Sequence, residues 1–189
     1  MGRRVTEDYI VEECGYLIEK FESQKGKPFD PIMIMNGAVG NIIVSIVLGE
    51  RFGYEDPQFV KLLHLINENV RVCGSPSVME ENDTNSYFQD GNLKALITNL
   101  FTAGLETTST TLRWGFLLMM KYPEIQQKVQ EEIERVLGSN PPRIEHRSKM
   151  PYTDAVVHEI QRFSNILPMD LPHETTMDVT LKGYFIPKE

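Results

Sequence analysis

Apolar residues recur every three or four positions along most of the chain, which is the spacing of helices with one buried face. The first such stretch predicts a helix over residues 6–21, with Ile10, Cys14, Leu17, Ile18 and Phe21 on its apolar face. Because a free cysteine packs as a small apolar residue, we expect the Cys14 thiol to lie in the core.

Two further helices are predicted to start in the same way, with an aspartate followed by a proline. Asp30 and Pro31 precede a segment that stays mostly apolar up to Gly49, and Asp56 precedes a third periodic segment. Polar and glycine residues interrupt the segment 31–48, so it reads as a helix buried in protein and not as a membrane span.

The second half of the chain is more regular than the first. The pattern predicts a long helix over 93–120, an amphipathic helix over 124–137 and a helix over 151–163. The tail alternates around Lys182-Gly183, as a short hairpin does. The predicted fold class is therefore mainly α with a small β-hairpin, whereas residues 73–92 show almost no periodicity.

Composition limits the possible functions. Of 189 residues, 41% are hydrophobic and 24% charged, as in one soluble globular domain. The net charge of −8, with lysine and arginine scattered, argues against a nucleic-acid partner. Cys14 and Cys73 lie far apart with no metal-ligand spacing, so neither a disulfide framework nor a zinc site is indicated.

The segment FTAGLETTSTT, residues 101–111, interrupts the long helix with residues that a stable helix would avoid. A glycine within a helix costs about 1 kcal/mol relative to alanine. Ala103, Gly104, Thr107 and Thr111 share one helix face. Such a face suits either a flat ligand lying against the backbone or a close contact with another helix, with the threonines bonded to their own helix.

A second candidate lies in the helix over 151–163, where Glu159 and Arg162 stand three residues apart on one face. Alone, this pair is a weak signal. It gains weight because the FTAGLETTSTT helix precedes it and the segment NILPMDLPH follows it.

Together these blocks resemble the cytochrome P-450 superfamily of haem-thiolate monooxygenases, and most closely the vertebrate microsomal family two. AGLETT (103–108) matches the pattern A/G-G-x-D/E-T-T, EIQR (159–162) matches ExxR, and LPH followed by TTMDVTLKGYFIPK matches the segment beneath the substrate pocket. The resemblance covers nearly the whole chain, so the expected fold is an incomplete cytochrome P-450 domain over residues 1–189.

The resemblance implies a haem cofactor, O2, a flavin-containing reductase and an apolar substrate such as a xenobiotic, a fatty acid or a steroid. It also implies the endoplasmic reticulum membrane as the location. The implied catalytic residues are Glu106 and Thr107, which form a proton relay. The other implied roles are cofactor binding by Ala103, Gly104, Thr107 and His173, substrate contact by Ala103, Leu167 and Leu171, and a structural pair of Glu159 and Arg162.

The sequence also departs from the family. The ligand signature F-x-x-G-x-x-x-C-x-G does not occur, and neither Cys14 nor Cys73 has such a frame, so no axial metal ligand is expected in this chain. From the resemblance, we also expect the anchor and first strands of the family to lie upstream of these residues, and Met79-Glu80 reads as a deletion junction. We expect the chain as written to be inactive, and the alternative is a non-catalytic helical interaction module.

Overall fold

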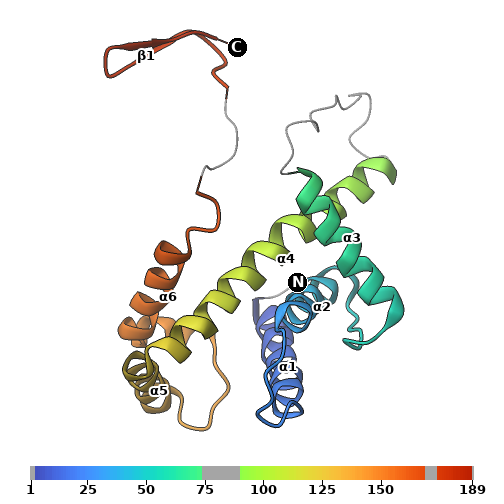
Figure 1. Cartoon of the computed structure of the whole chain (residues 1–189), viewed down its shortest axis with the longest axis vertical. Helices are drawn as coiled ribbons and strands as arrows, with labels where there is room; N and C mark the ends of the chain where they lie inside the picture. Colours follow the sequence, from blue (N-terminus) through green and yellow to red (C-terminus); the bar gives the residue numbers. More distant parts are fainter. Residues whose placement is uncertain (1–2, 74–89, 169–173, 189) are drawn as a thin grey trace.

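The structure is a computed structural model that describes the backbone of residues 3–73, 90–168 and 174–188 and the side chains of 4–66, 96–168 and 174–188. These residues form helices and one hairpin, which confirms the predicted fold class (Figure 1). The elements are α1 (Arg3–Glu22), α2 (Ile32–Leu48), α3 (Pro57–Cys73), α4 (Asp90–Lys121), α5 (Pro123–Leu137), the short 3-10 helix η1 (Ile144–Lys149), α6 (Pro151–Ser164), β1 (Val179–Leu181) and β2 (Tyr184–Ile186).

The predicted helix starts are confirmed by their hydrogen bonds. The Asp30 side chain accepts a bond of 2.9 Å from the Ile32 backbone N–H, and the Asp56 side chain accepts one of 2.8 Å from Gln58. Such bonds satisfy backbone donors that have no partner in the first turn of a helix. Gly49 ends α2 with φ at 75°, a conformation that glycine adopts without steric cost.

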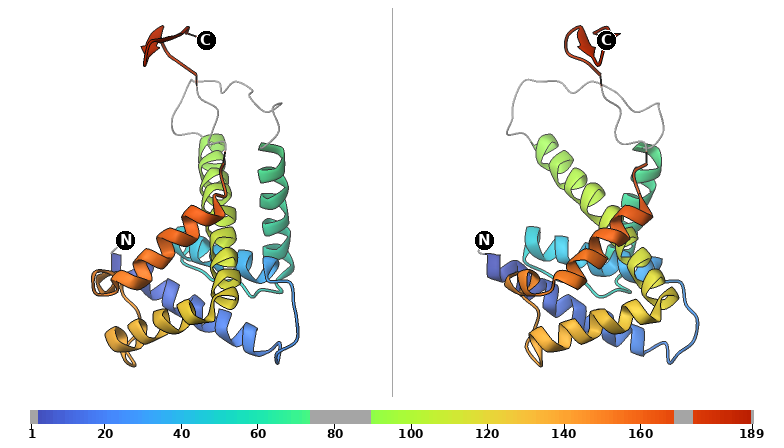
Figure 2. Two further views of the ribbon diagram at one scale, coloured as in Figure 1. Left: turned by 60° about the vertical axis from the view of Figure 1, so that its left-hand side comes forward. Right: turned by 90° about the vertical axis from the view of Figure 1, so that its left-hand side faces the viewer.

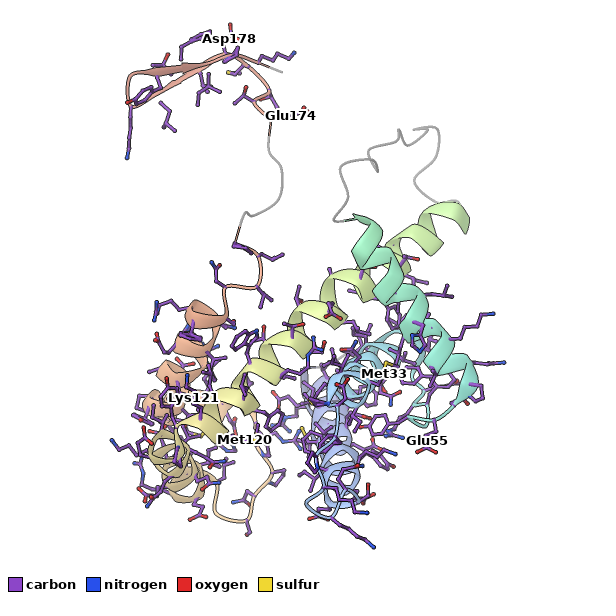
Figure 3. All side chains as sticks on the ribbon, viewed as in Figure 1. Met33, Glu55, Met120, Lys121, Glu174 and Asp178 are labelled. Atoms are coloured by element: carbon purple, nitrogen blue, oxygen red, sulfur yellow. The ribbon has the colours of Figure 1, made fainter. Side chains whose placement is uncertain are left out.

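The main core forms where α2, α3 and α4 meet. It consists of Val44, Phe59, Leu63, Ile66, Phe101 and Leu105. Figure 3 shows the side chains crowded around these helices, with Met33 on the α2 side. The Phe52 ring, from the loop after α2, stacks on Phe59 with centroids 5.6 Å apart. This core holds one face of the long helix α4 in place.

The prediction of which face of α1 lies in the core is wrong. Cys14 is exposed, Ile18 is 57% exposed, and the buried residue of this stretch is Glu13, at 3%. The physical reason is that Glu13 meets a charged partner: Arg51 Nε donates to its carboxylate at 2.8 Å, and the Tyr54 hydroxyl donates to it as well. A buried carboxylate needs such partners, and they fix the rotation of α1 more firmly than its apolar residues do.

The residues around Glu13 are also bound to one another. Asn41 of α2 donates to the Phe52 carbonyl at 2.9 Å and accepts from the Phe52 N–H at 3.0 Å. The Arg51 guanidinium lies over the Tyr16 ring, 3.6 Å from its centroid. Burial, followed by the hydrogen bond to Glu13, raises the pKa of Tyr54. The network thereby joins α1, α2 and the loop between α2 and α3.

The other helices gather at the C-terminal end of α4. Figures 1 and 2 show α5 and α6 beside this end, with α2 and α3 further along the helix. Trp114 of α4 meets Phe163 of α6 edge to face, with centroids 6.1 Å apart. Arg143, in the connection after α5, pairs with Asp8 of α1 at 2.7 Å, so this group is also tied to the N-terminal helix.

The hairpin has the register predicted for a two-residue turn. Val179 pairs with Ile186 and Leu181 with Tyr184, and the turn residues Lys182 and Gly183 both have positive φ, at 51° and 85°. Figures 1 and 3 show it apart from the helices, with Glu174 and Asp178 at its base. Its apolar side chains are exposed, Tyr184 by 77% and Phe185 by 66%.

Candidate functional site on helix 4

Helix α4 is apolar on two opposite faces. Ile97, Phe101 and Leu105 pack into the core with α2 and α3. The opposite face carries four residues that we call the open stripe: Leu96, Leu100, Ala103 and Thr107. Leu96 is 66% exposed and Leu100 is 48% exposed. Trp114 continues the stripe at helical spacing, but Phe163 of α6 covers it, so the stripe opens where α6 ends.

The threonine hydroxyls on this face bond to their own helix. Thr107 Oγ1 donates to the Ala103 carbonyl at 2.6 Å, and Thr111 Oγ1 donates to the Thr107 carbonyl at 2.8 Å. Each hydroxyl oxygen keeps lone pairs that can accept a hydrogen bond from outside the helix. The threonines are therefore bonded to their own helix, which was one of the two arrangements considered from the sequence. Thr107 can still accept a hydrogen bond on the open face.

Gly104 lies at the contact between two helices. A Cβ added there would lie 3.2 Å from Ile43 Cδ1 of α2, closer than an ordinary van der Waals contact. In this structure Gly104 therefore allows α2 and α4 to approach each other. The other role expected for Gly104, leaving space beside a bound ligand, stays a prediction.

The Glu106 carboxylate is engaged on the α2 side of the helix. It accepts hydrogen bonds from Arg113 at 3.1 Å, from Thr110 at 3.0 Å and from the buried Asn36 side chain of α2 at 3.4 Å. Its side chain is 32% exposed, so it is a partly buried, paired carboxylate that still reaches water. Glu106 and Thr107 are adjacent in sequence, yet their side chains bond to different groups.

Arg113 and Asn36 were not predicted as partners of Glu106. The signal for Arg113 was present, because it follows Glu106 by seven residues, two helical turns along the same side. The signal for Asn36 was its place in an otherwise apolar segment, where a polar side chain needs a partner.

Glu159 and Arg162 form the predicted pair on α6. Arg162 donates two hydrogen bonds of 2.7 Å to the Glu159 carboxylate, and the side chains are 60% and 70% exposed. The bonds from Arg162 lower the pKa of Glu159. Beside the pair lies a groove of about 330 Å³ between α4, α5 and α6, whose apolar lining includes Leu118, Tyr122, Ile125, Ile160 and Phe163.

The remaining predicted residues lie after α6. Leu167 follows α6 and is 59% exposed. Leu171 and His173 lie outside the described residues. The structure thus brings Ala103, Gly104, Glu106 and Thr107 together on one helix and places Glu159 and Arg162 on another.

A metal site is not formed by the described side chains, which contain no group of three or more His, Cys, Asp or Glu residues able to hold an ion. Cys14 lies on α1, and α1 packs on α2. Desolvation of its thiol, followed by the Glu13 charge, raises the pKa of Cys14.

The fold and the helix-4 site belong to a known class of protein. The family model for cytochrome P-450 matches residues 2–80 and 76–189 of the chain, so the protein is a member of the cytochrome P-450 family. The two matched ranges meet and overlap at residues 76–80, the region where the sequence indicates a junction.

Its curated relatives are similar over the whole chain. The chain is 40% identical to cytochrome P-450 2K4 of Oncorhynchus mykiss, 37% to cytochrome P-450 2F2 of Mus musculus and 38% to cytochrome P-450 2C11 of Rattus norvegicus. Each match uses 100% of this chain and 248 residues of alignment, against the 189 residues of the chain. The chain spans about half the length of these relatives, at 49% to 50%.

Among the described residues, no helix combines the length and the apolar character that a crossing of the bilayer requires. The buried character of α2 agrees with the sequence interpretation, because Met35, Ala38, Val39 and Val44 of this helix are all buried in protein.

Proposed function

We propose that this chain supplies the distal wall of the haem pocket of a cytochrome P-450 monooxygenase. The observation that carries the proposal is the open stripe: the AGLETT segment that the family uses presents Ala103 and Thr107 on a face that no described helix covers. The stripe fits a flat apolar group. Leu96 and Leu100 give it an apolar surface, and the small side chain of Ala103 lets such a group lie close to the helix backbone.

The haem, when bound, supplies the activation of O2 and the transfer of one oxygen atom to an apolar substrate. The task of the chain's own residues is to exclude water and to deliver protons. Thr107 Oγ1 accepts a hydrogen bond on the open face while its proton points to the Ala103 carbonyl. Glu106, which is partly exposed, passes protons from solvent to Thr107 through water, after turning away from Arg113.

The other roles follow from family resemblance and belong to the same proposal. His173 contacts a haem propionate, Leu167 and Leu171 line the substrate pocket, and Glu159 with Arg162 fixes the region behind the haem. The substrates are xenobiotics, fatty acids or steroids, the electrons come from a flavin-containing reductase, and the location is the endoplasmic reticulum membrane. Support comes from the named relatives, all of which are family-two proteins.

We also propose that residues corresponding to the relatives are missing inside this chain near residues 79 and 80, and that Cys14 and Cys73 do not act as the axial ligand. The missing segment is supported by the 248-residue alignments and by the break between the matched ranges. For Cys14, the support is its place on α1, which packs on α2, and a surrounding sequence that lacks the Phe and Gly positions of the ligand signature. On this proposal the chain as it stands does not form the thiolate centre.

A haemin titration of the purified chain, followed by absorbance, tests the distal wall. We expect saturable binding that Ala103→Phe weakens at least tenfold, because the ring would fill the surface on which the haem lies. Thr108→Phe is the matched control, since Thr108 is exposed on another face of α4. Equal binding by the two variants would refute the distal-wall proposal.

A spectrum of the reduced chain with carbon monoxide tests the axial ligand. We expect no thiolate-type shift of the Soret band. Such a shift, if lost in Cys14→Ser or Cys73→Ser, would identify the ligand and overturn that part of the proposal.

A further inference from the structure

We propose that His146 is a pH-sensitive switch in the connection between α5 and α6. In its neutral form the His146 ring holds the start of η1 in place, and its protonation releases this part of the chain. The inference does not depend on haem binding. It rests on the hydrogen bond that the ring accepts, on the contacts of Arg143 and on the charges around them.

The His146 ring accepts a hydrogen bond that only its neutral form can accept. The Arg143 backbone N–H donates to His146 Nδ1 at 3.0 Å. A ring nitrogen of histidine accepts a hydrogen bond only while it carries no proton, and both nitrogens of the protonated ring are donors. Protonation of Nδ1 would therefore set two donors against each other and break this bond.

The bond belongs to a reciprocal pair at the start of η1. The His146 N–H donates to the Arg143 carbonyl at 2.9 Å, while the His146 ring accepts from the Arg143 N–H. Such a pair is a capping box, in which a side chain in the first turn of a helix bonds the backbone of the residue that precedes the helix. Because η1 has only 6 residues and the internal bonds of a 3-10 helix have poor geometry, the cap contributes much of its order.

The residue that His146 holds also reaches another helix. Arg143 Nη1 lies 2.7 Å from a carboxylate oxygen of Asp8 in α1, and η1 itself packs against α5 and α6. The backbone bond that fixes Arg143 therefore also fixes the point from which its guanidinium reaches α1. Loss of the ring as an acceptor would loosen η1 and weaken the tie between this connection and α1.

The carboxylates that neighbouring helices bring to this connection already have partners. They are Glu7 and Asp8 of α1, Glu132 of α5 and Asp154 of α6. Their basic partners are Arg143 for the α1 pair, Arg135 for Glu132 and Arg147 for Asp154, and within η1 the side chains of Glu145 and Lys149 are exposed. Among the described residues none of these carboxylates forms an ion pair with the His146 ring, so protonation of the ring gains no partner in return for the lost bond.

The pH range of the switch follows from the residue type. Histidine is the side chain that ordinarily titrates between about pH 5 and 8. The bond is present where the ring is neutral, in the upper part of this range, and is lost as the pH falls and the ring takes up a proton. His158 differs, because one of its ring nitrogens lies 3.8 Å from an Asp154 oxygen and its protonation completes an ion pair.

Nuclear magnetic resonance of the whole, unmodified chain tests the bond directly. With isotopically labelled histidine, we expect His146 at about pH 7.5 to carry its proton on Nε2 and to leave Nδ1 free as an acceptor. A proton on Nδ1 under these conditions would overturn the proposal, because the ring could not then accept from Arg143. This measurement needs no substitution, so it does not depend on the folding of a variant.

Amide hydrogen exchange tests the switch. Between about pH 7.5 and about pH 5.5, we expect the protection of the Arg143 N–H, corrected for the intrinsic effect of pH on exchange, to fall at least threefold. His146→Asn should keep its protection at both pH values, because its side-chain oxygen takes the place of Nδ1 and does not titrate. His158→Asn is the matched control, and it should show the same fall as the unmodified chain.

Asp8→Asn separates the role of the ring from that of the ion pair. It removes the charged partner of the Arg143 guanidinium but leaves the bond to His146, so the fall in protection should persist. Three results would each overturn the proposal: no fall in the unmodified chain, an equal fall in His146→Asn, and a fall that disappears in Asp8→Asn. The last result would place the pH response in the Arg143–Asp8 pair.

Discussion

The Glu132 carboxylate of α5 caps the N-terminus of α6 by accepting hydrogen bonds from Thr153, at 2.7 Å from its backbone N–H and 2.8 Å from its hydroxyl. The Tyr152 N–H adds a third bond at 3.3 Å. These backbone donors have no partner within α6, because they belong to its first turn. Glu132 is only 6% exposed, so a carboxylate from a neighbouring helix serves as the cap that the sequence of α6 itself does not provide.

Glu132→Gln is expected to destabilise the protein in a pH-dependent way. Burial of the carboxylate opposes its ionisation, but the bonds from Thr153 and Tyr152 and the Arg135 charge together lower the pKa of Glu132 below its ordinary value of 4.5. The stabilisation is therefore present above pH 4.5 and is lost as the pH falls through the lower pKa of the folded state. Thermal unfolding at neutral and acid pH should show a loss of Tm at neutral pH that shrinks in acid. Glu134→Gln, an exposed position on the same helix, should change little at either pH.

Glu13→Ala is expected to cost about 3–5 kcal/mol in the free energy of unfolding, because it leaves Arg51 and Tyr54 without their shared partner. Urea unfolding measures the loss, and Glu12→Ala, at an exposed position, is the control. A loss below that of an ordinary surface change would contradict the structural role of Glu13.

Glu13→Ala should also alter the titration of Tyr54. Burial comes first among the causes that raise the pKa of Tyr54, and the bond to Glu13 comes second. Removing the carboxylate should therefore bring the ionisation of Tyr54 to a lower pH. Ultraviolet absorbance follows the formation of tyrosinate. The difference between the titrations of each protein with Tyr54 and with Tyr54→Phe isolates this group from the other tyrosines.

Two glycine-to-alanine substitutions are expected to have opposite signs. At Gly15, in the middle of α1, a Cβ would meet nothing within 4 Å, so Gly15→Ala should stabilise the protein by up to about 1 kcal/mol through helix propensity. At Gly37, in α2, a Cβ would lie 2.9 Å from the Tyr54 ring, so Gly37→Ala should destabilise it by about 1–3 kcal/mol through overpacking. Urea unfolding midpoints of the two variants, measured together, decide the matter.

Glu159→Gln is expected to leave the thermal stability nearly unchanged, in contrast to Glu132→Gln. Both side chains of the Glu159–Arg162 pair are mostly exposed, and exposed pairs contribute little because water screens them. A large drop in Tm would show that the pair supports the fold beyond the contacts described. Differential scanning calorimetry of the two variants side by side makes the comparison.

The helix boundaries could be predicted from sequence because each depends on local signals. Asp30, Asp56 and Gly49 act within one turn of the residues they cap, and Lys182-Gly183 determines its own turn. The rotation of α1 could not be predicted in this way. It depends on Arg51 and Tyr54, which lie 38 and 41 residues from Glu13, and a periodic pattern contains no information on such a pairing.

The candidate site was predictable in part for the same reason. The shared face of Ala103 and Thr107 follows from helix geometry alone. The direction of the Glu106 carboxylate does not, because Asn36 of α2, 70 residues away, contributes to it. Likewise, the close approach of Gly104 to Ile43 could not be predicted, because the two residues lie on different helices, 61 positions apart in the sequence.

The pairing of Arg143 with Asp8 also has a mechanical consequence. Helix α4 joins the α1–α2–α3 group to the α5–α6 group. If α4 were the only connection, the two groups could rotate relative to each other about its axis. The Arg143–Asp8 bridge, together with the contact of Phe21 at the end of α1 with Phe116 of α4, braces the joint at separate points. Because these contacts lie away from the axis of α4, we expect the two groups to move together as one rigid unit and not to rotate about the helix.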